Sequence, residues 1–242
     1  MKKILKYQCF DLVKALIIYY LVILLIISLA VIGMNVAGGT ERSGLGFSSE
    51  FFCLIVGLCM FREYFYLFMQ NGVSRKKIFA GACMCLVIFS AVMSAMDVLL
   101  LYLLEALPVG NITYMTISST LYYGYVNNAG PVLRLLVELV ISFLVMYVFF
   151  VAGYLISICF YRSPKPGKIV IAVGLPLLVV GGIPVLMVAF PDIFARLISF
   201  FLFIMGYSDT SSGNPFIGMV TLTVFSLVIT GLSYRAVKGA QI

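Results

Sequence analysis

The sequence contains no histidine and no tryptophan among its 242 residues, and only 10% of its residues are charged. Without histidine the chain cannot form a serine–histidine or cysteine–histidine nucleophile pair or a histidine metal site. It also lacks the Gly-x-x-x-x-Gly-Lys-Ser/Thr loop that cradles nucleotide phosphates, so it does not hydrolyse ATP by that route. We therefore expect a chain that is not itself an enzyme and holds no cofactor or metal of its own.

Apolar residues, in contrast, make up 63% of the chain. A soluble domain carries about a quarter charged residues, so most of this surface has to face a solvent other than water. Crossing about 30 Å of hydrocarbon takes roughly 20 apolar residues. The pattern predicts an all-α membrane protein with one transmembrane domain over residues 1–242. Its six spans are expected at about 15–34, 49–69, 78–104, 135–161, 169–190 and 215–234.

The basic residues indicate how these spans are oriented. Thirteen of the 16 lie before the first span, between spans two and three, between four and five, or after the sixth. Positive loops stay in the cytoplasm, which predicts cytoplasmic termini in a multi-pass protein of the plasma membrane. The net charge of +7 is therefore an orientation signal, and nucleic acid is not an expected partner.

Two further segments are expected to be helical. Residues 1–14 carry an apolar stripe flanked by lysines, which predicts an interfacial helix on the cytoplasmic face; a flank that only sets topology is the alternative. Residues 193–207 are apolar but too short to cross, which predicts a short re-entrant or interfacial outer helix between spans five and six. Glycines and prolines in the fifth span predict a kinked helix that either lines a conduit or packs closely.

Three residues are candidate intramembrane charges: Asp97 in the third span, and Arg134 and Glu138 near the outer end of the fourth. Arg134 and Glu138 lie four positions apart, so they share a helix face and can pair. The simpler interpretation is a set of outer-leaflet charges satisfied by their neighbours. The functional alternative is an ion- or proton-coupled secondary transporter that uses Asp97 and Glu138 as a relay.

The most specific local pattern follows the second span. Asn71-Gly72 predicts the end of a helix, because glycine readily adopts the left-handed conformation that closes one. Ser74 is expected to cap the next helix. The result is a helix–tight turn–helix elbow on the cytoplasmic face, preceded by aromatic residues and ending in a basic tip.

With this layout the sequence resembles the membrane subunits of ABC-2-type ABC transporters, the type V exporter fold. Those subunits have six spans, cytoplasmic termini, an N-terminal interfacial helix and short outer helices between spans five and six. A coupling helix between spans two and three seats in a groove of the ATPase subunit. The family pattern at this elbow, an acidic residue followed by Gly or Pro, an apolar residue and Ser-Arg, maps to Glu63, Gly72, Val73, Ser74 and Arg75.

The resemblance implies a permease subunit in a complex of two permease chains, copies or paralogues, and two ATPase chains that bind ATP and magnesium. Its small size makes it most similar to Gram-positive peptide or bacteriocin exporters and immunity transporters, such as phenol-soluble-modulin exporter permeases. The expected cargo is lipophilic or amphipathic, such as a peptide toxin, and is exported; a passive immunity protein is an alternative. The expected ATPase-coupling residues are Glu63, Phe65, Phe68, Met69, Gln70, Asn71, Gly72, Val73, Ser74 and Arg75.

Overall fold

The computed structural model describes residues 2–37, 42–43, 47–106, 113–114, 116–207 and 213–239. Nearly all of these residues are helical, and six helical segments among them are long and apolar enough to cross a membrane. Two strands of two residues each, β1 (Arg42–Ser43) and β2 (Thr113–Tyr114), pair in parallel. The prediction of an all-helical chain with six membrane-spanning segments is confirmed at this level.

Five of the six segments are each a single helix, and the fifth in sequence is divided into several short helical elements. The spans are α1 (Lys2–Ala37), α2 (Ser48–Gln70), α3 (Arg75–Ala106), α6 (Pro131–Arg162), the segment from α7 to α9, and α11 (Pro215–Lys238). The divided segment consists of α7 (Lys165–Ile169), η2 (Val170–Gly174), α8 (Leu175–Leu177), η3 (Leu178–Gly182) and α9 (Ile183–Ala189). The remaining helices are α4 (Ile117–Leu121), α5 (Tyr123–Asn128) and α10 (Pro191–Ile204).

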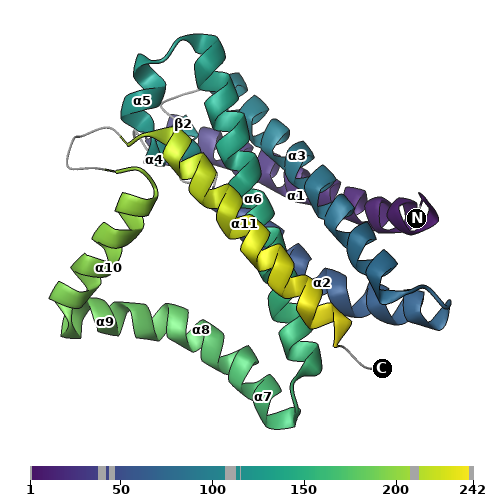
Figure 1. Cartoon of the computed structure of the whole chain (residues 1–242). Coiled ribbons are helices and arrows are strands. Elements are labelled where there is room, and N and C mark those ends of the chain that lie inside the picture. The colour runs from purple at the N-terminus through teal and green to yellow at the C-terminus, as the bar shows by residue number, and fades with distance from the viewer. Residues whose placement is uncertain are drawn as a thin grey trace.

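Helix α6 lies at the centre of the molecule, and α2, α3 and α11 pack against it (Figure 1). The α2–α6 contact is the most extensive, because two glycines face the opposite backbone across it. A Cβ atom on Gly57 would collide with the carbonyl oxygen of Phe150, and one on Gly153 with that of Leu54. Small residues allow helix backbones to approach closely in a membrane. These two glycines therefore determine how closely α2 packs on α6.

Helix α1 differs from the prediction. An interfacial helix at 1–14 was expected to be separate from a span at 15–34, but the structure has one continuous helix of 36 residues. No proline occurs in α1 and its first glycine is Gly33, so nothing interrupts its hydrogen-bond ladder. At 1.5 Å per residue the helix is about 54 Å long, well beyond the hydrocarbon thickness. Its apolar part covers Leu5–Leu29.

The connection between α2 and α3 is a four-residue turn, and the structure has no separate coupling helix there. Gly72 has a φ of 72°, in the left-handed region, so the predicted helix end is confirmed. The N–H of Val73 donates to the carbonyl of Phe68 and that of Gly72 to Met69, each at 3.0 Å, which is the Schellman pattern. Because this turn closes α2 and leads directly into α3, no residues are left to form an intervening helix.

Ser74 occupies the position before α3, as predicted. Its backbone carbonyl accepts hydrogen bonds from the N–H groups of Lys77 (2.9 Å) and Ile78 (3.1 Å). Among the described residues we find no hydrogen bond from its hydroxyl, so the expected side-chain cap is not formed. The start of α3 therefore depends on the backbone of the turn.

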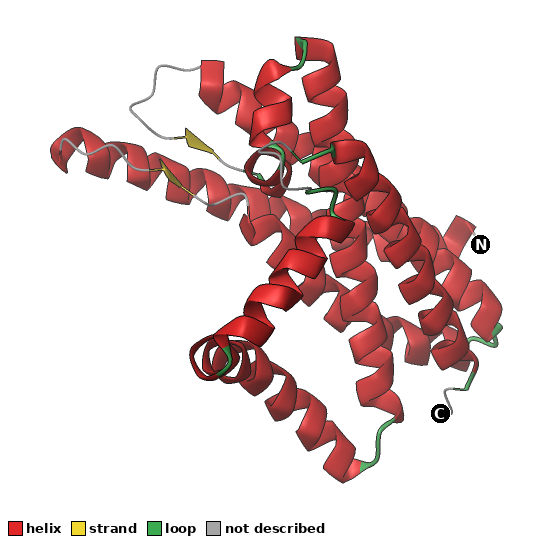
Figure 2. Ribbon diagram, turned by 60° about the vertical axis from the view of Figure 1, so that its left-hand side comes forward, coloured by secondary structure: helices red, strands yellow, loops and turns green. Residues whose placement is uncertain are grey.

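The segment from α7 to α9 stands away from the bundle (Figures 1 and 2), and none of its described residues is buried. The predicted irregularity is confirmed, because it contains two π-helical turns, η2 and η3, which end at Gly174 and Gly182. Pro176 and Pro184 each follow two residues later. A proline removes a backbone donor and crowds the preceding turn, so the helix widens there. After Phe190 the chain turns back along α10, in which no residue is buried either.

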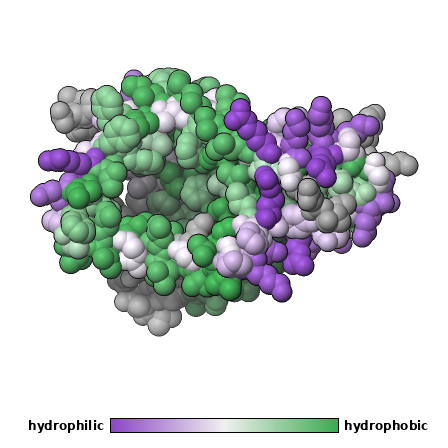
Figure 3. Space-filling model, turned by 60° about the horizontal axis from the view of Figure 1, so that its bottom comes forward, coloured by the Kyte–Doolittle hydropathy of each residue, from purple (hydrophilic) through white to green (hydrophobic). Residues whose placement is uncertain are grey.

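Both termini lie at the same end of the bundle as the α2–α3 turn (Figure 1). In the space-filling view of Figure 3, hydrophilic side chains gather on that side. On the other side, apolar side chains surround a hollow. A smaller group of hydrophilic side chains lies at the far edge of the apolar side.

Candidate functional site

Residues 70–77, here called the tip, form the exposed end of the α2–α3 connection. Most of its side chains are exposed: Gln70, Asn71, Gly72, Ser74, Lys76 and Lys77. The Asn71 side-chain amide donates to the carbonyl of Leu67 at 2.7 Å, which adds to the closure of α2. The tip is thus an ordered projection whose polar and basic groups are open to a partner.

The ten predicted coupling residues differ in how exposed they are in the structure. Glu63, Gln70, Asn71, Gly72 and Ser74 are exposed, Met69, Val73 and Arg75 are half-buried, and Phe65 and Phe68 are buried. The ring of Phe65 stacks on Phe61 at 4.9 Å between centroids and meets the edge of Tyr161 at 5.8 Å. Phe65 and Phe68 therefore hold the tip on α6 and α1 instead of forming its outer surface.

The first turns of α1 pack on the end of α2 that leads to the tip. The ring of Tyr7 makes edge contacts with Tyr64 at 6.2 Å and Phe68 at 6.5 Å. The Tyr64 hydroxyl donates to Asp11 Oδ2 at 3.3 Å. The segment that was expected to form a separate interfacial helix thus contributes to the base of the tip.

Two arginines connect the tip and α6 to the end of α11. Arg75 Nη1 donates to the carbonyl oxygen of Lys238 at 3.0 Å, and Arg162 Nη1 donates to that of Ala236 at 3.2 Å. The last carbonyls of a helix lack partners within the helix, and the helix dipole favours cations there. Sequence reasoning missed both contacts, because Arg75 and Lys238 lie 163 residues apart and no local pattern indicates the pairing.

Asp97 lies in a buried polar cluster between α1, α2 and α3. Its side chain is 1% exposed, and its Oδ1 accepts a hydrogen bond from the Tyr20 hydroxyl at 2.9 Å. The Ser49 hydroxyl lies beside it and is 2.9 Å from that of Tyr19. Glu50, the next residue after Ser49 in the first turn of α2, is only 3% exposed. Sequence reasoning did not identify Glu50 as a buried carboxyl group.

Arg134 and Glu138 belong to a second cluster. Arg134 Nε is 3.3 Å from Glu138 Oε1, which confirms the predicted pairing, and Arg134 Nη2 is 2.7 Å from Glu105 Oε1. The guanidinium also lies over the ring of Tyr102, 5.3 Å from its centroid. Asp97 and Glu138 share no partner among the described residues, so the structure does not assemble the relay that the sequence suggested.

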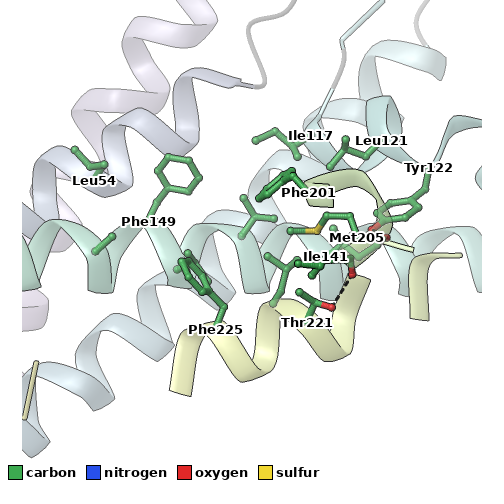
Figure 4. A pocket seen from close by; sticks show the side chains of 15 residues that line it. Leu54, Ile117, Leu121, Tyr122, Ile141, Phe149, Phe201, Met205, Thr221 and Phe225 are labelled. Carbon is green, nitrogen blue, oxygen red and sulfur yellow. Dashed lines mark hydrogen bonds between the residues drawn. The ribbon is translucent and has the colours of Figure 1, made fainter. Parts of the chain in front are cut away.

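An apolar cavity of about 540 Å³ lies between the bundle and α10 (Figure 4). Its walls come from α2, α4, α6, α10 and α11. The residues that line it are Leu54, Ile117, Leu121, Tyr122, Ile141, Val145, Val148, Phe149, Ala152, Phe201, Ile204, Met205, Thr221, Leu222 and Phe225. Its two side-chain polar groups are already engaged: the Tyr122 hydroxyl donates to the carbonyl of Met205, and Thr221 Oγ1 to that of Ile204, each at 2.8 Å.

Tyr122 holds the outer elements together. Its hydroxyl lies directly over Gly218, where a Cβ atom would collide with it, so α11 needs a glycine at this position. Burial raises the pKa of Tyr122 to about 12, and the hydroxyl therefore keeps its proton for the bond to Met205 at any physiological pH. The cavity consequently offers hydrocarbon surface and no free hydrogen-bonding side chain.

The described residues contain no cluster of three or more His, Cys, Asp or Glu side chains that could hold a metal ion. The candidate functional features of the described residues are the exposed tip, the two buried polar clusters and the apolar cavity. Comparison with models of protein families, with curated proteins and with solved structures finds no significant match to the chain.

Proposed function

We propose that this chain is the membrane permease subunit of an ATP-driven exporter of the ABC-2 type, energised by a separate ATPase subunit. The observation that carries the proposal is the tip, an exposed, ordered turn between two long helices at the end of the molecule where both termini lie. A partner that binds residues 70–77 contacts the ends of both α2 and α3, because only four residues separate these helices.

The packing behind the tip supports transmission of such a movement. Helix α2 is in backbone contact with α6 at Gly57 and Gly153, and Arg75 joins the tip to the end of α11. Close-packed helices shift as units and do not deform continuously, so displacement of the tip moves α2, α3 and α11 relative to their neighbours. This is the rigid-body motion that a nucleotide-driven partner would exploit.

The apolar lining of the cavity favours an apolar or amphipathic cargo, such as a peptide. The 540 Å³ cavity has no free polar side chain, and none of the charged residues of the described bundle lines it. A hydrophilic solute would lose its hydration without gaining hydrogen bonds. The proposed complex contains a second permease chain and two ATPase chains that bind ATP and magnesium, and it exports its cargo across the plasma membrane.

The test is purification of the tagged chain from its native membrane, followed by identification of bound ATPase and measurement of ATP hydrolysis. We expect an ATPase subunit to co-purify, and Lys76→Glu/Lys77→Glu to lose it while the variant still inserts. The matched control is Lys165→Glu/Lys168→Glu, which reverses two charges in another basic segment. Absence of an ATPase from the wild-type complex, or equal retention by both variants, would overturn the proposal.

The same experiment separates the alternatives. A passive immunity protein or an ion- or proton-coupled carrier would act without a bound ATPase. The carrier that uses Asp97 and Glu138 receives no support from their positions, because the two carboxyl groups lie in different clusters.

A further inference from the structure

The apolar cavity between α6 and α10 is elongated. Five of its lining residues lie on one face of α6, at positions 141, 145, 148, 149 and 152. At 1.5 Å rise per residue this stripe is about 16 Å long. In Figure 4, Leu54 and Phe149 lie at one end of the cavity, and Tyr122 and Met205 lie at the other. The volume of about 540 Å³ is typical of sites that bind small ligands.

Water is a poor occupant of this space. A buried water molecule needs about two to four polar partners. The two polar side chains of the cavity, Tyr122 and Thr221, already donate to the carbonyls of Met205 and Ile204, and the other lining residues are apolar. An empty cavity destabilises a fold in proportion to its volume, because the atoms around it lose van der Waals contacts. The lining therefore favours hydrocarbon as the occupant.

The cavity is open to the surroundings of the bundle. Phe201 of α10 and Phe225 of α11 both line it, yet 59% of Phe201 and 52% of Phe225 is exposed. Phe225 lies near the middle of α11, which is long and apolar enough to cross a membrane. At that depth the surrounding medium consists of the acyl chains of the bilayer. Acyl chains are therefore the hydrocarbon that reaches the opening.

The α10 wall of the cavity is fixed at one end. Tyr122 and Thr221 hold its last carbonyls, and Gly206, with a φ of 89°, closes the helix there. Elsewhere the main contacts of α10 are with α9 and α11, and none of its residues is buried. A chain lying between α10 and α6 would therefore supply packing that the described part of the protein does not.

We propose that the cavity is a binding site for one acyl chain of a bilayer phospholipid, which occupies it in the absence of any cargo. The chain lies along the stripe on α6, against the rings of Phe201 and Phe225. The head group stays outside, because the cavity offers it no hydrogen bond. The elongated shape suits an unbranched chain. The proposal does not depend on the exporter function; an exported apolar cargo would have to displace this lipid.

The test is native mass spectrometry of the chain purified in detergent from its own membrane. We expect one phospholipid molecule to remain bound to the wild type. Ala152→Phe places a ring inside the cavity and should lose this lipid. Ala95→Phe, the matched control, adds the same ring at an exposed position of α3 that does not line the cavity, and should keep it. Absence of phospholipid from the wild type, a peptide or free fatty acid in its place, or equal retention by both variants would overturn the proposal.

Thermal unfolding guards against misfolding of the cavity variant. After removal of lipid, added phosphatidylglycerol should raise the unfolding temperature of the wild type and of Ala95→Phe. Ala152→Phe should unfold no lower than the lipid-free wild type and should not respond to lipid, because its own ring fills the space. An equal shift in all three proteins, or a lower unfolding temperature for Ala152→Phe, would contradict the proposal. Because no ATPase is needed for these measurements, failure here and failure of the exporter proposal are distinguishable.

Discussion

At the scale of single residues, Gly57 and Gly153 determine how closely α2 approaches α6. Gly57→Ala or Gly153→Ala places a methyl group on an opposing carbonyl oxygen, so the helices must separate. We expect each substitution to lower the free energy of unfolding by about 1 to 3 kcal/mol. Gly231→Ala in α11 is the control, because a Cβ there meets nothing within 4 Å. Denaturation in detergent followed by circular dichroism measures the difference, and three variants of equal stability would refute this packing.

Arg134 is the second residue with a large expected effect, because it is the cation of a cluster that contains two carboxylates. Arg134→Met leaves Glu138 buried beside no positive charge, and breaking a buried pair in this way costs about 3 to 5 kcal/mol. Adding Glu138→Gln to the variant should recover part of the loss. The same denaturation measurement tests both.

Glu105→Gln provides the internal comparison for this cluster. The Glu105 side chain is 47% exposed, and pairs of that kind contribute at most about 1 kcal/mol. If Glu105→Gln destabilised the chain as much as Arg134→Met, the cluster would not be organised around Glu138.

At the scale of elements, the packing of the first part of α1 is tested by two thiols. Cys9 Sγ of α1 lies 3.3 Å from Cys85 Sγ of α3. A mild membrane-permeable oxidant should therefore join them in a disulfide, detected by mass spectrometry of proteolytic peptides. Cys85→Ser, which retains Cys83 two residues away, should give no cross-link. An N-terminal segment lying apart on the membrane surface would leave Cys9 unlinked in both proteins.

The elements also show which features can be read from sequence. The end of α2 at Gly72 and the irregular backbone near Pro176 and Pro184 are predictable, because each depends on residues within one helical turn. The packing of the first turns of α1 is not, since the lysines that suggest a surface helix say nothing of the contacts of Tyr7 and Asp11 with α2.

The candidate site divides in the same way. The Arg134–Glu138 pair follows from a spacing of four residues on one helix. The contact of Tyr20 with Asp97 joins residues 77 positions apart, and that of Arg75 with Lys238 joins residues 163 apart. Such pairings arise from the tertiary packing of helices, which a single sequence does not reveal.

At the scale of the whole molecule, the distribution of basic residues predicts that the tip and both termini face the cytoplasm. Lys76→Cys and Asp192→Cys, each in a background without the native cysteines, place single thiols on the tip and on α10. In intact cells a membrane-impermeant thiol reagent should label position 192 but reach position 76 only after permeabilisation. The reverse labelling pattern would show that the topology is inverted. Labelling of both positions in intact cells would show that the tip lies on the outer face.

Among the described residues, the segment from α7 to α10 makes its main contacts with the bundle through α7 on α6 and α10 on α11, and most of its exposed side chains are apolar. None of the described residues of α7 to α10 is buried by the rest of the chain. The hydrocarbon tails of the surrounding lipids, and not other helices of this chain, would therefore have to solvate its apolar side chains.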